Sequence, residues 1–195
     1  MDINSFINKM TDTAIKNNTI NPELYSMYNT KRGLRNNDGS GVIVGLSQIG
    51  DVHGYIFDEG VRVPDEGRLT YRGILINDLV YNTLREKRNG FEEVAYFLIF
   101  GRLPSAVELE DFNDLLDQYR TLPDGFAEDM ILKAPSRDVM NKLARSVLAS
   151  YSYDVDADDV SIANVLRQCI ELIARFPTMI AYGYQAKSHY HDGKS

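Results

Sequence analysis

The chain has 195 residues, of which 44% are hydrophobic and 25% are charged, and its formal net charge is -7. This composition excludes a disordered chain and is sufficient for one globular domain with a sizeable core, or for part of a larger domain. The negative charge argues against a nucleic-acid surface, because such a surface uses clustered Lys and Arg to neutralise phosphates.

The sequence shows no secretory signal and no membrane segment. Residues 1–4 lack both the basic and the apolar region of a signal peptide. The longest apolar run, Val94 to Phe100, is far shorter than the roughly 20 residues that a membrane helix requires. Cys169 is the single cysteine, which excludes an internal disulfide, and its apolar neighbours predict an inert, packed thiol. We therefore expect a cytoplasmic protein with no membrane or nucleic-acid partner.

The first 70 residues predict helices followed by strands. Apolar residues recur on one face from Asp2 to Asn18, which is typical of an amphipathic helix. Asn21-Pro22-Glu23 predicts a shorter helix that continues through Met27, since proline suits a first helical turn. The segment Gly33 to Gly41 has the composition of a loop. From Val42 to Thr70, β-branched and aromatic residues punctuated by glycine predict short strands or hairpins.

Residues 68–90 predict an extended segment that turns into a helix. The piece Tyr71 to Ile76 is short and partly β-branched, and Asn77 is the expected cap of the helix that follows it. Apolar residues at helical spacing extend that helix from Asp78 to Lys87. Asn89-Gly90 is the expected stop.

A second helix is expected directly after this stop. Asn89 lies three residues before Glu92, the spacing of a capping box. Phe91 to Phe100 is apolar on nearly all sides, which predicts a helix in a core. Gly101 is the expected C-terminal stop, and Ser105 to Glu108 form a further capping box.

The rest of the chain predicts further helices. Phe112, Leu115, Leu116 and Tyr119 share one face, and Met130 belongs to a shorter segment. Ser136 is expected to open a helix with apolar residues at 140, 143, 144, 147, 148 and 151. The acidic run 154–159 predicts a helix start, because carboxylates interact well with the helix dipole. The next buried stripe is expected at 160, 163, 166, 170, 173 and 174, with Pro177 bending or ending the helix.

Three segments of this sequence resemble the citrate synthase family. Tyr71-Arg72-Gly73 followed by Ile76 to Leu79 is similar to the family's YRG-x-x-I-x-D-L element, and Glu92 to Pro104 is similar to its EE-V-A-Y-L-L-x-x-G-x-L-P element. Arg175 to Tyr182 is similar to the family's lysine-leucine-proline-threonine-x-x-alanine segment. The resemblance runs from about Gly33 to the last residue. It implies a mainly α fold with a few short strands near residues 42–72. We expect an N-terminal helical segment at 1–32 and the N-terminal part of the family's large domain at 33–195, with the chain ending before the catalytic region.

The resemblance also implies an activity for the full-length protein. Citrate synthases condense acetyl-CoA with oxaloacetate, using an aspartate as the base, histidines that stabilise the enol and polarise the ketone, and arginines that bind carboxylates. The family's H-G-G-x-N and G-H-R-V-Y motifs are absent here, so we assign no catalytic, cofactor or metal residue and expect this chain alone to be inactive. The resemblance further implies a homodimer. The hypothesis is an N-terminal fragment of a citrate synthase or 2-methylcitrate synthase; the alternative is a non-catalytic helical interaction or dimerisation module.

Four residues have side chains that could take part in catalysis or binding, but a structural role is the preferred interpretation for each. His53 lacks the family's neighbouring residues and is expected to be a surface or turn histidine. His189 and His191, with Asp192 beside them, could offer metal ligands, but a third and fourth ligand are not evident, and a polar connector is the preferred interpretation. Arg72 could bind a substrate carboxylate, yet an internal salt bridge or backbone contact is favoured.

Three motif-like patterns fail on their spacing. Gly193-Lys194-Ser195 lacks the earlier glycine of a phosphate-binding loop. The aspartates at 154, 156 and 158 resemble a calcium loop, but Asp159 replaces its glycine and Val165 its glutamate. Gly39-Ser40-Gly41 lacks the third glycine and the βαβ unit of a dinucleotide site.

Overall fold

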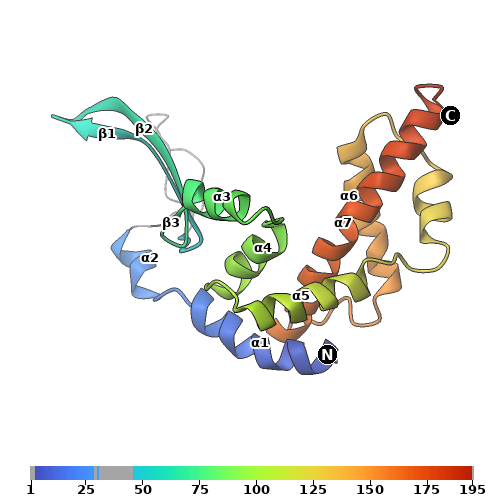
Figure 1. Ribbon diagram of the computed structural model, residues 1–195, viewed down its shortest axis with the longest axis horizontal. Helices are drawn as coiled ribbons and strands as arrows, with labels where there is room; N and C mark the ends of the chain where they lie inside the picture. Colours follow the sequence, from blue (N-terminus) through green and yellow to red (C-terminus); the bar gives the residue numbers. More distant parts are fainter. Residues whose placement is uncertain (1–2, 29, 31–45, 195) are drawn as a thin grey trace. The chain divides into compact units, whose positions relative to one another are not determined.

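The computed structural model describes residues 3–28, 30 and 46–194 of the chain, and it is mainly helical with one small sheet (Figure 1). This confirms the expected fold class. The chain divides into two compact units, residues 12–109 and residues 1–11 with 110–195. The expected loop Gly33 to Gly41 and the first strand residues, Val42 to Val44, lie outside the described residues. The proposed division at residue 32 stays a prediction.

The sheet of the unit 12–109 is an antiparallel hairpin with a short third strand. β1 (Gly50–Asp58) pairs with β2 (Val61–Tyr71), and β3 (Ile74–Leu75) pairs with the end of β2. Glu59 and Gly60 join β1 to β2 with φ angles of 50° and 82°. Two consecutive positive φ angles are those of a type I′ turn, whose twist matches that of the paired strands. Strands are therefore present where they were expected, but β1 and β2 form a ribbon that is longer than the short strands of the prediction.

A second two-residue turn joins β2 to β3. Arg72 and Gly73 have φ angles of 46° and 83°, and Tyr71 pairs with Ile74 across the turn. The chain then enters α3 (Ile76–Arg85) directly. This confirms that an extended segment turns into a helix here.

The termini of α3 differ from the prediction. Asn77 lies inside the helix and Leu75 occupies the cap position, so the expected Asn77 cap is wrong. The helix ends at Arg85, before the expected stop at 89–90. Lys87 takes the left-handed conformation, and the amide of Arg88 donates to the carbonyl of Thr83 at 3.1 Å. This 6→1 bond satisfies the last turn without a glycine.

Helix α4 (Phe91–Phe100) starts without the expected capping box. Gly90 is its cap residue and no side chain caps it, so the Asn89 prediction is wrong. Tyr96, Phe97 and Phe100 are buried, but Phe91 is 61% exposed. The helix therefore contributes to a core with part of its surface rather than on all sides.

The two predicted signals after α4 are confirmed. Gly101 has a φ of 76° and its amide donates to the carbonyl of Phe97 at 2.9 Å. Before α5 (Ala106–Tyr119), the amide of Glu108 donates to Ser105 Oγ at 3.3 Å, and the amide of Ser105 donates to Glu108 Oε2 at 2.9 Å. This reciprocal pair is a complete capping box.

The N-terminal helices agree with the sequence pattern. α1 (Ile3–Asn18) begins in one unit and ends in the other, and Phe6 and Met10 on its predicted face are buried. The ring of Phe6 stacks on that of Phe112, with centroids 6.2 Å apart. α2 (Glu23–Met27) follows as the expected short helix.

The unit containing residues 110–195 is helical. After α5 come a π-helical turn η1 (Ala127–Leu132), α6 (Val139–Ser150), a 3₁₀ turn η2 (Tyr151–Tyr153) and α7 (Ile162–Tyr190). α7 packs against α6 and η1. The core between them consists of the buried residues Phe126, Ile131 and Met179 and the partly buried residues Leu122, Leu143, Ala149 and Phe176.

Helix α6 begins and packs differently from the prediction. Its cap is Asp138, which accepts from the amide of Asn141 at 3.0 Å, and not Ser136. Lys142 and Ser146 are buried, whereas Met140 and Leu148 are 71% and 76% exposed. The apolar spacing predicted the helix but not which side faces the unit. The reason is that the Lys142 ammonium binds two backbone carbonyls in the interior.

Helix α7 also corrects two expectations. Its cap is Ser161, and no acidic residue lies in its first turn, so the acidic run 154–159 does not start the helix. The helix continues through Pro177 to Tyr190, so the alternative in which this proline ends it is wrong. Leu166, Ile170 and Ala174 are buried as predicted, but Val160 is exposed. Across the described part of the chain, none of the helices combines the length and apolarity required to cross a membrane.

Candidate functional site

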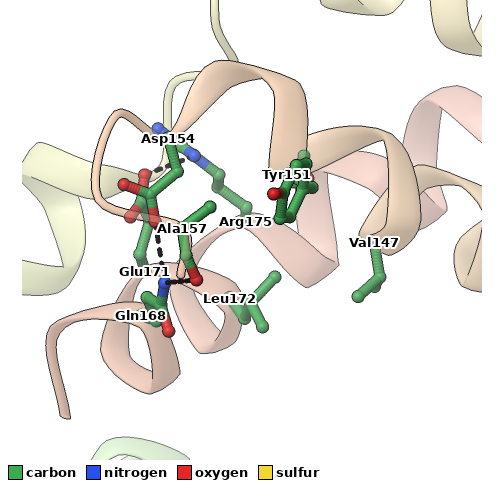
Figure 2. Close-up of a pocket in the computed structure, with 9 residues that line it drawn as sticks. Val147, Tyr151, Asp154, Ala157, Gln168, Glu171, Leu172 and Arg175 are labelled. Atoms are coloured by element: carbon green, nitrogen blue, oxygen red, sulfur yellow. Dashed lines mark hydrogen bonds and ion pairs between the residues drawn. The ribbon is translucent and has the colours of Figure 1, made fainter. Parts of the chain in front are cut away.

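A cavity opens in the unit 110–195, where the end of α6 and the following turn face α7 (Figure 2). Its volume is about 160 Å³. The lining combines charged, polar and aliphatic side chains, namely those of Val147, Ser150, Tyr151, Asp154, Ala157, Gln168, Glu171, Leu172 and Arg175.

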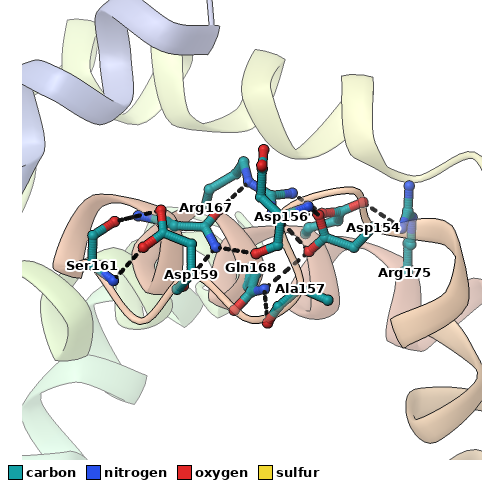
Figure 3. Close-up of polar contacts among 10 residues, drawn as sticks. Asp154, Asp156, Ala157, Asp159, Ser161, Arg167, Gln168 and Arg175 are labelled. Atoms are coloured by element: carbon teal, nitrogen blue, oxygen red, sulfur yellow. Dashed lines mark hydrogen bonds and ion pairs between the residues drawn. The ribbon is translucent and has the colours of Figure 1, made fainter.

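Asp154 is the centre of the polar contacts around this cavity (Figure 3). Both of its carboxylate oxygens accept from Arg167 Nη2, at 2.7 Å each, and Oδ2 also accepts from Gln168 Nε2 at 2.9 Å. Burial raises the pKa of Asp154, but the hydrogen bonds from Arg167 and Gln168 outweigh it and hold that pKa below its usual value. The carboxylate is therefore kept ionised.

Glu171 continues this network along α7. Its Oε2 accepts from Arg167 Nη1 at 2.9 Å, and its Oε1 is paired with Arg175 Nη1. Arg175 Nε is buried and has no hydrogen-bond partner among the residues that the structure describes. Two carboxylates and two guanidinium groups thus alternate along one line, and their charges balance.

The same network holds the loop before α7. Asn164 Nδ2 donates to the carbonyls of Asp156 and Asp159, at 2.8 Å each, and the amide of Ser161 donates to Asp159 Oδ1 at 2.8 Å. Tyr151 Oη donates to Asp158 Oδ2 at 2.8 Å. The acidic run therefore folds onto α6 and α7 through its own hydrogen bonds, and Asp154, Asp158 and Asp159 are engaged with protein donors.

The charged cluster has the properties of a structural ion-pair network and not those of a proton-transfer site. A general acid or base that works near neutral pH needs a pKa shifted toward that range. Asp154 has its pKa shifted the opposite way, and Glu171 is shared by two arginines. The cluster is thus built to hold the loop 154–161 against α7 rather than to transfer protons.

The structure places His53 in β1 of the unit 12–109, and His53 is not among the residues that line this cavity. Its Nε2 lies 2.5 Å from Asp65 Oδ2 of β2, and Arg68 lies 3.8 Å from the same oxygen. Hydrogen bonding by His53 lowers the pKa of Asp65. None of the cavities described here is lined by a histidine. His53 joins two strands of the ribbon, in keeping with its expected position in the strand and turn region.

The two C-terminal histidines lie at the end of α7. His189 is in the last turn and its ring meets that of Tyr190 edge to face, with centroids 4.8 Å apart. His191 follows the helix, and Asp192 is bound to Lys187 at 2.7 Å. No group of three metal-ligating side chains occurs among the described residues.

The prediction for Arg72 is confirmed, whereas the prediction for Cys169 is wrong. The Arg72 guanidinium donates to the carbonyls of Leu98 and Asn17 and to Asn18 Oδ1, which confirms the expected internal backbone contact. Cys169 is exposed, so the prediction of a packed thiol is wrong. Its apolar neighbours at 166 and 170 are buried, but residue 169 lies on a different side of the helix.

Sequence reasoning missed Arg167 and Lys142. Arg167 and Glu171 are four residues apart on α7, a spacing that indicates an ion pair, but nothing local connects Arg167 to Asp154. Lys142 lies between apolar residues in α6 and is 2% exposed. Its buried position depends on two carbonyl acceptors 8 and 12 residues earlier, those of Ala134 and of Met130 in η1.

The family-like segment 175–182 lies in the second half of α7 and lines two further cavities. One, of about 410 Å³, is formed by one side of α7 at Pro177, Thr178, Ala181, Tyr182 and Gln185. The other, of about 430 Å³, lies between this helix and residues 120–128. Thr178 Oγ1 donates to the carbonyl of Arg120 at 3.2 Å and connects the two segments.

Comparison with known proteins finds a family match and several related enzymes. The family model "Citrate synthase, C-terminal domain" matches residues 38–194. The chain is 32% identical to citrate synthase of Corynebacterium glutamicum over 124 residues, 63% of this chain and 27% of that protein. It is 30% identical to citrate synthase of Haloferax volcanii over 155 residues, 77% of this chain and 35% of that protein. A 2-methylcitrate synthase of C. glutamicum is 31% identical over 127 residues, 65% of this chain and 32% of that protein.

Solved structures agree with the sequence comparison. Citrate synthase from Pyrobaculum aerophilum has a TM-score of 0.60 and 26% identity, covering 80% of this chain and 39% of that one. Citrate synthase from Thermoplasma acidophilum, solved with carboxymethyl coenzyme A and oxaloacetate, has a TM-score of 0.59 at 17% identity, covering 75% of this chain and 34% of that one. The chain spans about a third of the length of these relatives. From the matched residues and the shared fold, this chain belongs to the citrate synthase family.

Proposed function

We propose that this chain is the supporting N-terminal part of a citrate synthase-type acyltransferase. The full protein would condense acetyl-CoA with oxaloacetate to citrate and CoA. The family match over residues 38–194 supports the reaction type, and coverage of about a third of the relatives' length supports a role as one part of a longer enzyme. The chain would supply helical frame, while the groups that move protons and bind both substrates lie outside its 195 residues.

The described residues support this division of labour. The histidines are at the ribbon and at the end of α7, and the cavity beside α6 is lined by charges that neutralise one another. No cofactor is part of the proposal, and acetyl-CoA enters as a substrate of the full protein.

Propionyl-CoA is the second candidate acyl donor. A 2-methylcitrate synthase from the same organism as one citrate synthase relative shows nearly the same identity to this chain. The two reactions differ by one methyl group on the acyl donor. An enzyme distinguishes acyl donors that differ by one methyl group through the shape of its acyl pocket.

The full protein is also proposed to be a homodimer in the cytoplasm. α6 exposes Met140 and Leu148, and the adjacent α7 exposes Ile162 and Val165. Large exposed apolar side chains on two helices that pack together are compatible with a surface that another chain covers. An exposed free thiol at Cys169 is compatible with a reducing compartment.

Thiol release tests the division of labour directly. The purified 195-residue chain is incubated with acetyl-CoA and oxaloacetate, and free CoA is measured with a thiol reagent. We expect no turnover above the background of a heat-denatured sample. Sustained, enzyme-dependent CoA release would show that the catalytic groups lie within this chain and would overturn the proposal.

A further inference from the structure

The junction between α3 and α4 contains Asn89-Gly90, the single Asn-Gly pair in the sequence. α3 ends at Arg85 and α4 begins at Phe91, so the pair lies in the connection between the two helices. Asn89 is exposed and its backbone is irregular. The backbone nitrogen that follows an asparagine can attack the side-chain amide carbon, and glycine has no side chain to shield this approach. The pair is therefore a candidate for chemical modification.

The atoms that would react are not held by other groups. Among the residues that the structure describes, neither the Asn89 side chain nor the backbone N–H of Gly90 has a hydrogen-bond partner. Asn113 offers the contrast: it is also exposed, but it lies inside α5. There the following backbone N–H is bonded along the helix, so its nitrogen cannot turn toward the side chain. The reaction is open at residue 89 and restrained at residue 113.

The fold leaves no room for a side chain at position 90. The φ of Gly90 is −109°, which other residues adopt, but an added Cβ would lie 2.6 Å from Cγ2 of Thr83 in α3. The Thr83 hydroxyl donates to the carbonyl of Val80 at 2.9 Å, which holds its side chain in this position. The close approach of the two helices therefore requires the glycine that makes the pair reactive.

We propose that Asn89 is a site of spontaneous deamidation. The Gly90 nitrogen forms a bond to Cγ of Asn89 and gives up its proton, and the side-chain nitrogen takes up this proton and leaves as ammonia. The product is a succinimide ring, which water opens at either of its carbonyls. Opening at Cγ gives aspartate with an unchanged main chain. Opening at the main-chain carbonyl gives isoaspartate, whose main chain continues through Cγ and whose α-carboxyl is free.

The two products have different effects on the junction. In the aspartate form the new negative charge lies just before the N-terminus of α4, where the helix dipole favours it. The isoaspartate form inserts one extra atom into the main chain after Arg88. The Arg88 guanidinium donates to both carboxylate oxygens of Glu93 across this segment, at 2.8 and 3.2 Å. A bidentate pair depends on alignment, so the isoaspartate form should lose it and be less stable.

Peptide mapping of the full chain tests the site. The folded protein is incubated at neutral pH and then cleaved after glutamate at mildly acidic pH, which releases residues 87–92 as one fragment. A synthetic peptide of the same sequence is incubated in parallel. We expect the fragment to gain the mass difference between OH and NH₂, and the fragment that contains Asn113 to stay unmodified. An intact Asn89 in the folded chain when the synthetic peptide has converted would overturn the proposal, as would equal conversion at Asn113.

A matched pair of substitutions assigns the isoaspartate to one residue. Isoaspartate is measured by enzymatic transfer of a labelled methyl group from S-adenosylmethionine to its free α-carboxyl. Asn89→Gln lengthens the side chain by one methylene and requires a larger ring that closes far more slowly, so the labelling should be lost. Asn113→Gln makes the same change in α5 and should leave the labelling unchanged. Labelling that persists in Asn89→Gln would overturn the assignment.

Thermal unfolding tests the effect on the junction. Asn89→Asp reproduces the aspartate product and keeps the main chain unchanged. The isoaspartate form, separated chromatographically from the incubated protein, should have a lower Tm than this variant, because the two carry the same charge and differ only in the main chain. An equal Tm would overturn the proposed loss of the pair between Arg88 and Glu93.

Discussion

Arg72 donates two hydrogen bonds to the carbonyl oxygen of Leu98, from Nε at 3.3 Å and from Nη2 at 2.8 Å. The same guanidinium donates to the carbonyl of Asn17 at 3.1 Å and to Asn18 Oδ1 at 2.7 Å. One side chain therefore connects the turn after β2 to the ends of α1 and α4. Burial lowers the pKa of Arg72, which shows that the surroundings oppose its charge while these acceptors stabilise it.

Replacement of Arg72 tests this connection. Arg72→Met should lower the free energy of unfolding by about 2–3 kcal/mol, because charge-assisted hydrogen bonds are lost and helix-end carbonyls are left unpaired. Arg68→Met is the control: Arg68 is an exposed arginine of the same sheet, and its loss should change stability by less than about 0.5 kcal/mol. Urea unfolding followed by circular dichroism measures both. Equal stability of the two variants would contradict a structural role for Arg72.

The conformation of Arg72 permits a finer comparison. Its φ of 46° is unusual for a residue with a side chain. Arg72→Gly removes the hydrogen bonds but relieves the backbone, whereas Arg72→Met removes the hydrogen bonds alone. Arg72→Gly should therefore be less destabilised than Arg72→Met by about 1 kcal/mol. The same urea experiment compares the free energies of unfolding of the two variants. A lower stability of Arg72→Gly would contradict a free-energy cost of the positive φ at this position.

Among the described glycines of the unit 12–109, Gly101 should be the least tolerant of substitution. Its φ is 76°, and a Cβ there would lie 2.7 Å from the Cβ of Asn17. Gly101→Ala should destabilise the protein by about 2–4 kcal/mol through the backbone conformation and the collision together. Gly73 is the control: its φ is 83°, and apart from its chain neighbours no atom of the described residues lies within 4 Å of its added Cβ. Gly73→Ala should therefore cost only the conformational part, and thermal unfolding would show a smaller decrease of Tm.

Glu108 should make stability depend on acid pH. Hydrogen bonding by Arg102, followed by that of the Ser105 amide, lowers the pKa of Glu108 from 4.5 to about 2. The unfolded chain therefore binds more protons between these values, and the stabilisation is fully present above pH 4.5 and lost as the pH falls toward 2. Glu108→Gln should be less stable than wild type by about 1–2 kcal/mol at pH 7, after allowance for solvent screening. The difference should shrink on acidification. A difference independent of pH would contradict the ionic origin of the effect.

Lys142 should act in the opposite pH range. It is 2% exposed, and its Nζ donates to the carbonyl of Met130 in η1 and to that of Ala134, which follows η1. Burial, followed by the charge of Arg145, lowers its pKa below 10.5. Above the folded pKa the unfolded chain binds more protons, so stability gained through this group rises with pH up to about 10.5.

Lys142→Met removes this group and tests its role. It leaves two carbonyls unpaired and should destabilise the protein by about 1–3 kcal/mol. The difference from wild type should increase at alkaline pH. Lys133→Met is the control, because the Lys133 side chain is exposed and its ion pair is with Asp129, also an exposed residue. Amide hydrogen exchange of residues 127–134, corrected for intrinsic rates, locates the loss; unchanged protection there would contradict the anchoring of η1 by Lys142.

Local sequence signals predicted much of the fold. The capping box of Ser105 and Glu108, the stop at Gly101 and the buried face of α1 need only residues a few positions apart. Each is a relation between side chain and backbone within one or two helical turns, so spacing suffices to identify it. The family elements at 71–79 and 92–104 likewise indicated the fold class and the family before any coordinates.

Tertiary structure alone decided the rest. The partners of Arg72 are 26 to 55 residues away, those of Asp154 are 13 and 14 residues away, and the buried side of α6 is set by η1. The sequence therefore determined which segments form helices and which family they belong to. Only the folded chain decided that Lys142 is buried while Leu148 is exposed, because the acceptors that stabilise a buried charge come from a different segment and no local pattern encodes their approach.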